Sequence, residues 1–346
     1  MPSPAPRPLA ALPKAHLHLH FTGSMRTSTV RELAAEHGMR LPEVLTGGPR
    51  AHFDVDEDSR GWFRFQRTYD AARHCVRGEA DMRRIVREAA IDDGAEGSVW
   101  LELQIDPTSY APFVGGITPA LEIVLDEAAA VSRVPGAAAV GIMVAASRMR
   151  HPLEARTLAR LAARYAGSGP GTVVAFGLSN DERRGETAEF AAAFAIARRA
   201  GLLLAPHAGE LLGAEAVSHT LDALEPERLG HGVRSVEDPR VLDRLAADGV
   251  ALEVCPGSNV ALGVYDTAEE VPLRRILDAG VRVALGADDP LIFGTRLLDQ
   301  YLAAREVHGL DDRALADLAR ASLTASRVPT QVRERAFAEI DAWLAG

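Results

Sequence analysis

The chain has few cysteines and no long apolar segment. Only Cys75 and Cys255 occur among its 346 residues. Two cysteines this far apart cannot form the disulfide framework of a small secreted protein, so a reducing compartment is expected. No apolar run approaches a membrane span, and the proline-rich stretch 1–8 lacks the apolar core of a signal peptide. We therefore expect a cytoplasmic protein that does not bind membranes.

Lysine is also scarce, and acidic residues outnumber basic ones. The formal net charge is −10, and Lys14 is the only lysine because the other basic residues are arginine. Such a surface would repel an anionic polymer, which argues against a nucleic-acid partner. A small anionic ligand could still meet a local arginine. The composition does not indicate an oligomeric state.

What the sequence does contain is a repeated strand–helix alternation. Mostly continuous apolar runs, as expected for buried parallel strands, are each followed by a helical stretch. Eight such units favour a (β/α)8 TIM barrel in one domain, 1–346, over a doubly wound sheet. The segment 1–10 is expected to be a disordered lead-in, 41–60 an excursion over the barrel mouth beside helices, and 299–344 helical. The predicted strands are 15–21, 98–105, 139–146, 172–179, 202–207, 228–231, 250–255 and 281–286.

The first predicted strand carries a row of histidines. His16, His18 and His20 alternate with leucine, and alternate residues of a strand point to one face. Neutral imidazoles are good zinc ligands. The competing interpretation is that these histidines satisfy backbone groups, and the tract alone leaves both open.

Other ionisable residues follow later strands. Barrel enzymes build their sites at the carboxyl ends of the strands. His18 and His20 with His207 and Asp288 would give a zinc ion three nitrogens and one oxygen, with an open position for water. The groups left over suit proton transfer and substrate anchoring. They are Glu210, His231 and Asp289.

These strings resemble the adenosine deaminase family of the amidohydrolase superfamily. The matching segments span nearly the whole chain in the family's order. They are Leu12-Pro-Lys-Ala15 before His18-Leu-His20, His207-Ala-Gly-Glu210, Gly230-His-Gly232, Glu253-Val-Cys-Pro256 and Asp288-Asp-Pro-Leu-Ile-Phe293.

The resemblance implies one zinc ion per chain, held by the four ligands named above. Relatives with two metals bridge them with a modified lysine at the end of strand 4, and none lies there. Glu210 would protonate purine N1, and His231 would orient the attacking water and help take its proton. Asp289 would hold N7, and Asn180 stands where the family places a glycine whose backbone contacts N3. His16 would lie beneath the metal.

The resemblance also bears on the substrate. Where the family usually has an acid that accepts the ribose 5′-hydroxyl, this chain has Thr22. The string Phe21-Thr-Gly-Ser-Met-Arg26 looks like the variants that deaminate 6-aminodeoxyfutalosine on a route to menaquinone. That substrate carries a benzoate at its 5′ end, for which Arg148, Arg150 or Arg26 could provide a cation, with Arg148 the named candidate.

The resulting hypothesis is a zinc-dependent deaminase of a 6-aminopurine nucleoside, with 6-aminodeoxyfutalosine favoured. Adenosine is the alternative substrate and free adenine the third. An amidohydrolase acting on an amide, lactone or phosphoester, or a barrel that only binds a nucleoside, would be a different class. Zinc content and loss of the adenine chromophore distinguish these classes.

Overall fold

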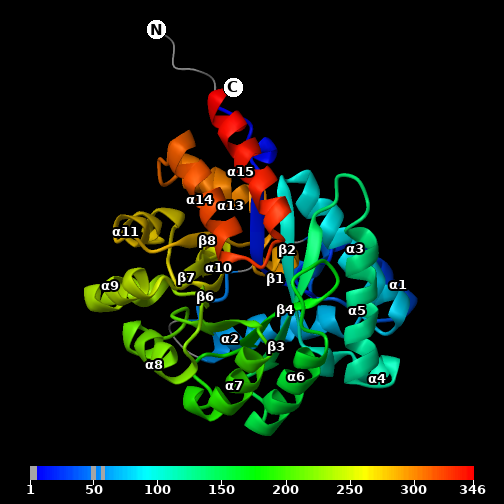
Figure 1. The fold of residues 1–346 in the computed structure, drawn as a ribbon. Helices are drawn as coiled ribbons and strands as arrows, with labels where there is room; N and C mark the ends of the chain where they lie inside the picture. Colours follow the sequence, from blue (N-terminus) through cyan, green and yellow to red (C-terminus); the bar gives the residue numbers. More distant parts are fainter. Residues whose placement is uncertain (1–5, 48–51, 56–58) are drawn as a thin grey trace.

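The computed structural model describes residues 6–47, 52–55 and 59–346, and its centre is a parallel β-barrel (Figure 1). Its eight strands lie side by side in sequence order. A bridge between Leu19 and Asp288 joins the last strand to the first, because the Asp288 N–H donates to the His18 carbonyl at 3.0 Å. The barrel prediction is confirmed. The strands are β1 (Lys14–His20), β2 (Ser98–Ile105), β3 (Ala139–Ser147), β4 (Val173–Ser179), β5 (Leu203–Ala208), β6 (Arg228–His231), β7 (Ala251–Val254) and β8 (Val283–Leu285).

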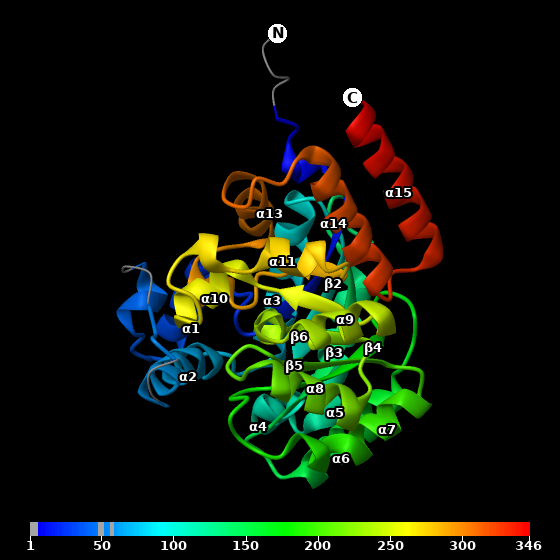
Figure 2. The ribbon, with the colours of Figure 1, turned by 90° about the vertical axis from the view of Figure 1, so that its left-hand side faces the viewer.

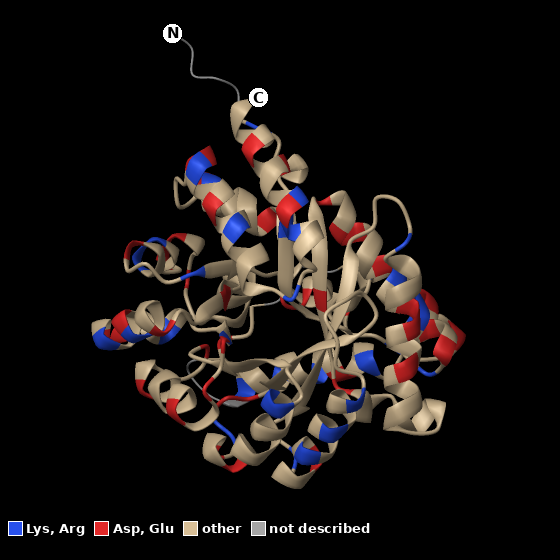
Figure 3. Cartoon of the chain, viewed as in Figure 1, with Lys and Arg blue, Asp and Glu red and all other residues tan. Residues whose placement is uncertain are grey.

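Helices surround the barrel because each has one apolar face. In the helix Pro239–Asp248, for example, Val241, Leu242 and Leu245 are buried, and the Asp238 side chain caps the first turn. Charged residues lie mainly on the outer helices and few lie on the strands (Figure 3). The α-helices are α1 (Thr27–Glu36), α2 (Ser59–Arg73), α3 (Glu79–Ala95), α4 (Ala111–Val114), α5 (Ile117–Val131), α6 (Pro152–Arg164), α7 (Ala191–Arg199), α8 (Ala214–Leu224), α9 (Pro239–Asp248), α10 (Pro256–Leu262), α11 (Leu273–Asp278), α12 (Pro290–Phe293), α13 (Leu297–Glu306), α14 (Asp312–Ala325) and α15 (Thr330–Ala345).

Short 3-10 helices complete the connections. They are η1 (Leu9–Ala11), η2 (Glu43–Thr46), η3 (Pro107–Ser109), η4 (Thr187–Phe190), η5 (Val233–Glu237) and η6 (Ala268–Glu270).

The connection between β1 and β2 is the longest excursion, as predicted. It holds α1, η2, α2 and α3; α1 and α2 both lie on the left in Figure 2, and α2 packs against α10. Parts of the predicted excursion 41–60 lie outside the described residues, namely 48–51 and 56–58. The described part of α2 places aromatic and basic side chains at the barrel mouth.

The described part of the expected disordered lead-in is ordered, which corrects that prediction for residues 6–10. Leu9 is buried, and Arg7 donates to the Leu344 carbonyl at 2.6 Å. The Trp343 indole donates to the Pro8 carbonyl at 3.0 Å. The C-terminal helix thus supplies the partners that hold this segment, and residues 1–5 lie outside the described part. Within the described ranges, no helix is both long and apolar enough to cross a membrane.

Candidate metal and catalytic site

The three histidines of β1 occupy two different environments. His16 lies between the Asp93 carboxylate, 2.9 Å from its Nδ1, and the backbone N–H of Ala287, 3.0 Å from its Nε2. Both of its ring nitrogens are therefore occupied by protein groups. His18 and His20 lie nearer the carboxyl end of the strand and face other imidazoles. His16 therefore lies on the amino-terminal side of His18 and His20 and is not part of their cluster.

Four predicted ligands converge at the barrel mouth. The His20 Nε2 atom lies 3.3 Å from Nε2 of His207 and 3.2 Å from Oδ1 of Asp288. The same carboxylate oxygen lies 3.6 Å from Nε2 of His18. Three strands, β1, β5 and the end of β8, thus direct nitrogen and oxygen donors at one point.

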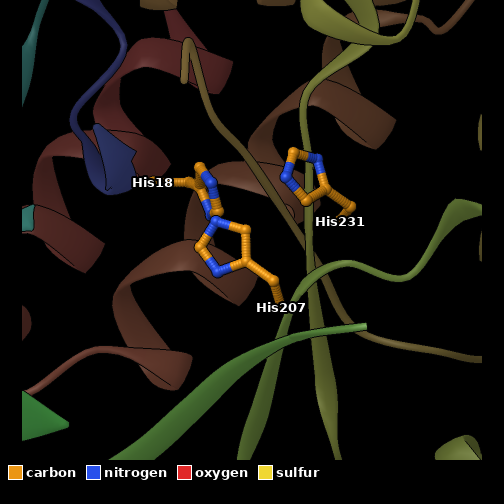
Figure 4. Close-up of side chains that lie close together, drawn as sticks. All are labelled: His18, His207 and His231. Atoms are coloured by element: carbon orange, nitrogen blue, oxygen red, sulfur yellow. The ribbon is translucent and has the colours of Figure 1, made fainter. Parts of the chain in front are cut away.

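His231 joins the same group, which the sequence had placed outside the ligand set. Its ring centroid is 4.7 Å from that of His18 and 5.1 Å from that of His207. Figure 4 shows the three rings turned toward one another. One atom each of His18, His207 and His231 lies within 4.8 Å of the others, as does one atom each of His18, His20 and Asp288.

The donor set fits a divalent metal. Nε2 of His18 is fully buried and has no hydrogen-bond partner among the described residues, and the facing Nε2 atoms of His20 and His207 need a proton or a cation between them. Burial, followed by the neighbouring imidazoles, lowers the pKa of His207 well below its usual value. Neutral imidazoles around a carboxylate are a ligand set typical of zinc.

Buried acceptors and donors orient two of the ligands. Glu253 on β7 accepts from Nδ1 of His18 at 2.7 Å, which leaves Nε2 directed at the cluster. The Ser258 hydroxyl donates to Oδ2 of Asp288 at 2.6 Å, which leaves Oδ1 for the ligands. Burial would lower the pKa of His18, but the neighbouring carboxylates of Asp288 and Glu253 raise it to about 10. Such supporting contacts fix ligand orientation.

The backbone is strained where the site residues leave their strands. His231 has φ 63°, Asp288 has φ 61° and Asn180 has φ 81°, a left-handed region that side chains other than glycine rarely adopt. Each such residue costs roughly 1–3 kcal/mol and persists where its surroundings demand it. Gly230 is also required, because a Cβ there would lie 2.9 Å from the His18 ring.

Glu210 carries a buried carboxyl group, and the backbone around it is anchored by Glu182. The Glu182 carboxylate accepts from four consecutive amides, Gly209 to Leu212, at 2.6–3.1 Å. Burial, followed by the carboxylates of Asp288 and Glu182, raises the pKa of Glu210 well above its usual value. A protonated acid beside His231, whose Nε2 lies 3.5 Å away, can donate a proton to a ligand. Sequence reasoning assigned no role to Glu182.

Asp289 does not cap the helix that follows it. It occupies the position before α12, yet its side chain makes no capping hydrogen bond, and its Oδ1 atom is buried without a partner among the described residues. Burial, followed by the adjacent Asp288 carboxylate, raises the pKa of Asp289 well above its usual value. The side chain therefore presents an unpaired carboxyl oxygen to the cavity. Gly23 packs so closely that a Cβ there would overlap this carboxyl.

A cavity of about 560 Å³ opens above the cluster, and its wall has two parts. The metal-side wall consists of His20, His207, Glu210, His231, Asp288 and Asp289. The rest of the lining mixes aromatic, neutral polar and charged side chains, and we take from it one set of residues as the α2-side wall. We define it as Phe63, Tyr69, Arg73, Gln104, Tyr110, Ser147, Met149 and Arg150. Asn180 also lines the cavity, between the two walls.

Thr22 does not line the cavity, which corrects its expected role as a direct contact to the substrate's 5′ end. It is fully buried, and its hydroxyl lies 2.6 Å from the hydroxyl of Tyr110. Tyr110, which does line the cavity, therefore stands between Thr22 and the cavity. The hydrogen-bond partner of the Thr22 hydroxyl lies 88 residues further along the chain, so sequence spacing could not indicate it.

Arg148, the named candidate partner for a substrate carboxylate, also lies outside the cavity lining. It is buried, and it donates to the Thr187 hydroxyl at 2.8 Å and to the His207 carbonyl at 2.6 Å. Arg26 forms an ion pair with Asp92 instead. Of the three arginines considered, Arg150 is the one that reaches the cavity.

The barrel and its cluster of imidazoles and acids define a hydrolytic deaminase of the amidohydrolase type, in agreement with comparisons to known proteins. The adenosine deaminase family model matches residues 13–343, so the chain belongs to the adenosine deaminase family.

Relatives and solved structures cover the chain almost completely. Two relatives, from Streptomyces virginiae and Streptomyces coelicolor, are each named "Putative adenosine/adenine deaminase" and are 58% identical to this chain. Each match covers 98% of this chain, and the matches cover 99% and 98% of the two relatives, respectively. The crystal structure of an adenine deaminase from Arthrobacter aurescens superposes with a TM-score of 0.86 at 27% identity, over 96% of this chain and 99% of that one.

Proposed function

We propose that this chain is a zinc-dependent enzyme that hydrolyses the 6-amino group of a purine nucleoside. The observation that carries the proposal is the buried Glu210 carboxyl beside a cluster of four converging ligand side chains, His18, His20, His207 and Asp288. When bound there, zinc would act as a Lewis acid and lower the pKa of a coordinated water to about 7.

The chain's own acids would bind the purine edge. Glu210 donates its proton to N1, which draws electrons from C6 and makes it electrophilic. Asp289 donates to N7, an acceptor, which requires the raised pKa that its burial produces. The backbone N–H of Asn180 is our candidate donor to N3.

His231 would handle the proton of the attacking water. Burial, followed by the neighbouring His18, lowers the pKa of His231 to about 3, so its ring is neutral and can accept a hydrogen bond from the attacking water. Water adds to C6, the C6–N bond breaks, and ammonia leaves after receiving the proton. One water is consumed for each amine converted to a carbonyl.

Within this class we favour 6-aminodeoxyfutalosine as the substrate. A cavity of about 560 Å³ exceeds the needs of a free base and falls in the range for larger ligands, about 300–1,000 Å³. Its rim combines exposed apolar side chains, Phe63 at 60% and Met149 at 56%, with Arg150. An aromatic carboxylate at the 5′ end would match both features.

Adenosine and adenine are the competing substrates because the names of the relatives include them. The test is kcat/KM on 6-aminodeoxyfutalosine, adenosine and adenine, with the protein stripped of metal by a chelator and reloaded with zinc. We expect activity to vanish on stripping and return with zinc, and 6-aminodeoxyfutalosine to be preferred. A more than tenfold preference for adenosine or adenine would overturn the substrate assignment, and activity without any metal would overturn the zinc assignment.

A further inference from the structure

Gln104 is a buried amide whose polar atoms have no partner in the described part of the chain. It lies on β2 beside His20 of β1, lines the cavity and is 2% exposed. Neither its Oε1 nor its Nε2 atom makes a hydrogen bond to the described residues. A buried amide without partners costs free energy, so such a group needs an explanation.

Its position separates it from the other unpaired groups of the cavity. Among the described lining residues, buried side-chain atoms without a partner occur in His207, His231, Asp289 and Gln104. The first three belong to the metal-side wall, where the unpaired atom of His207 is Nδ1 and not the Nε2 atom that faces His20. Gln104 is the member of that set on the α2-side wall.

The neighbours of Gln104 on this wall already have partners. The Tyr110 hydroxyl pairs with Thr22, and the Ser147 hydroxyl accepts from the backbone N–H of Met149 at 3.2 Å. Arg73 pairs with Asp70 at 2.8 Å. Gln104 is thus a neutral group in this wall with both a donor and an acceptor still to be satisfied.

The chemistry of a primary amide defines what it would bind. It presents two N–H donors and one acceptor oxygen, which complement hydroxyl groups that donate and accept in turn. In the proposed function the purine's acceptor atoms meet Glu210, Asp289 and Asn180. The remaining hydrogen-bonding groups of a nucleoside near the base are the ribose hydroxyls, and a free base has none.

We propose that Gln104 binds the ribose hydroxyls of the substrate and makes the site select purine nucleosides over the free base. This inference rests on the proposed function and names the residue that distinguishes its substrate class. A free base lacks these hydroxyls and could offer the amide only its N9–H, and sites built to bind a hydroxyl discriminate strongly against ligands that lack it.

The test compares Gln104→Leu and Gln104→Met with the parent zinc-loaded enzyme on adenosine, 2′,3′-dideoxyadenosine and adenine. We expect both variants to lose at least about tenfold in kcat/KM on adenosine and less than about twofold on the other two compounds. The advantage of adenosine over its dideoxy analogue should shrink by the same factor. Gln331→Leu on the exposed face of α15 is the matched control and should change nothing.

Each result separates this inference from the proposed function. An equal loss on adenine and adenosine would show that Gln104 contacts the base or supports the fold, and would overturn the inference. An unchanged ratio of kcat/KM on adenosine to kcat/KM on dideoxyadenosine would also overturn it. In that case deamination by the parent enzyme would still support the deaminase assignment. A parent enzyme that deaminates no 6-aminopurine would overturn both. Thermal melting of the two variants, with different side-chain shapes, identifies a loss that comes from misfolding.

Discussion

The two walls of the cavity differ in how they are built. The metal-side wall gathers ionisable groups whose partners are one another, as in the contacts of Asp288 with His20 and of Glu210 with His231. The α2-side wall is mostly neutral and aromatic, and it combines α2, which precedes β2, with side chains from β2 and β3. The first wall is suited to a reaction and the second to the shape of a substrate.

The largest effect should come from the acid of the metal-side wall. Glu210→Gln keeps the size of the side chain but removes the proton that we assign to purine N1. We expect kcat to fall by about 100-fold to 10,000-fold with a small change in KM. Steady-state kinetics on the best substrate measure it, with Glu215→Gln, exposed on α8, as the control. A variant with near-normal kcat would show that another group supplies the proton.

The sequence predicted the metal-side wall well for a physical reason. Its residues follow strands directly, so the strand ends fix their positions once the barrel is recognised. Short motifs such as His207-Ala-Gly-Glu210 carry the reacting groups within a few residues of one another. The sequence indicated that His231 would act on the attacking water, but the short distances from its ring to those of His18 and His207 are visible only in the structure.

The side chains in and behind the α2-side wall were predicted poorly, because their hydrogen-bond partners lie far away in the sequence. Thr22 was taken for a substrate contact, but Tyr110 covers its hydroxyl. Arg148 was taken for an anion partner, but it holds the His207 carbonyl. Gln104 was not singled out at all, since an isolated glutamine in a strand gives no signal until its unpaired amide is seen inside a cavity.

The buried support behind the metal-side wall should have the next largest effect. Glu253 links Nδ1 of His18 to the buried Arg228, which lies 2.6 Å from its other oxygen. Glu253→Gln weakens both contacts, and we expect zinc affinity to fall by about 10-fold to 100-fold. Competition with a chromophoric chelator measures that affinity. Glu306→Gln, exposed at the end of α13, is the control, and an unchanged affinity would confine Glu253 to supporting the fold.

The smallest effect on catalysis should come from a group outside both walls, Lys14 at the amino end of β1. Burial lowers its pKa from 10.5 to about 7, against the opposing influence of Asp93 and Glu96. Its Nζ atom donates to the carbonyls of Leu9 at 3.0 Å and Glu96 at 2.6 Å. A neutral amine has two N–H groups, which these two carbonyls satisfy.

The sign of the pH dependence follows from that lowered pKa. Below about pH 7 both folded and unfolded chains carry the charged amine, and the folded state bears the full cost of burying it. Between pH 7 and 10.5 the unfolded chain binds a proton that the folded chain has released, so this cost disappears as the pH rises. Stability should therefore rise by up to about 1.4 kcal/mol per pH unit relative to a Lys14→Met variant. Urea unfolding of both proteins between about pH 7.5 and 9.5 measures the difference in stability. The ratio of their kcat/KM values should stay constant over the same range, because the amine is remote from both walls. Parallel stability curves would instead show that the folded chain keeps the lysine charged, and a pH-dependent ratio of kcat/KM would mean that the amino end of β1 is coupled to the site at its other end.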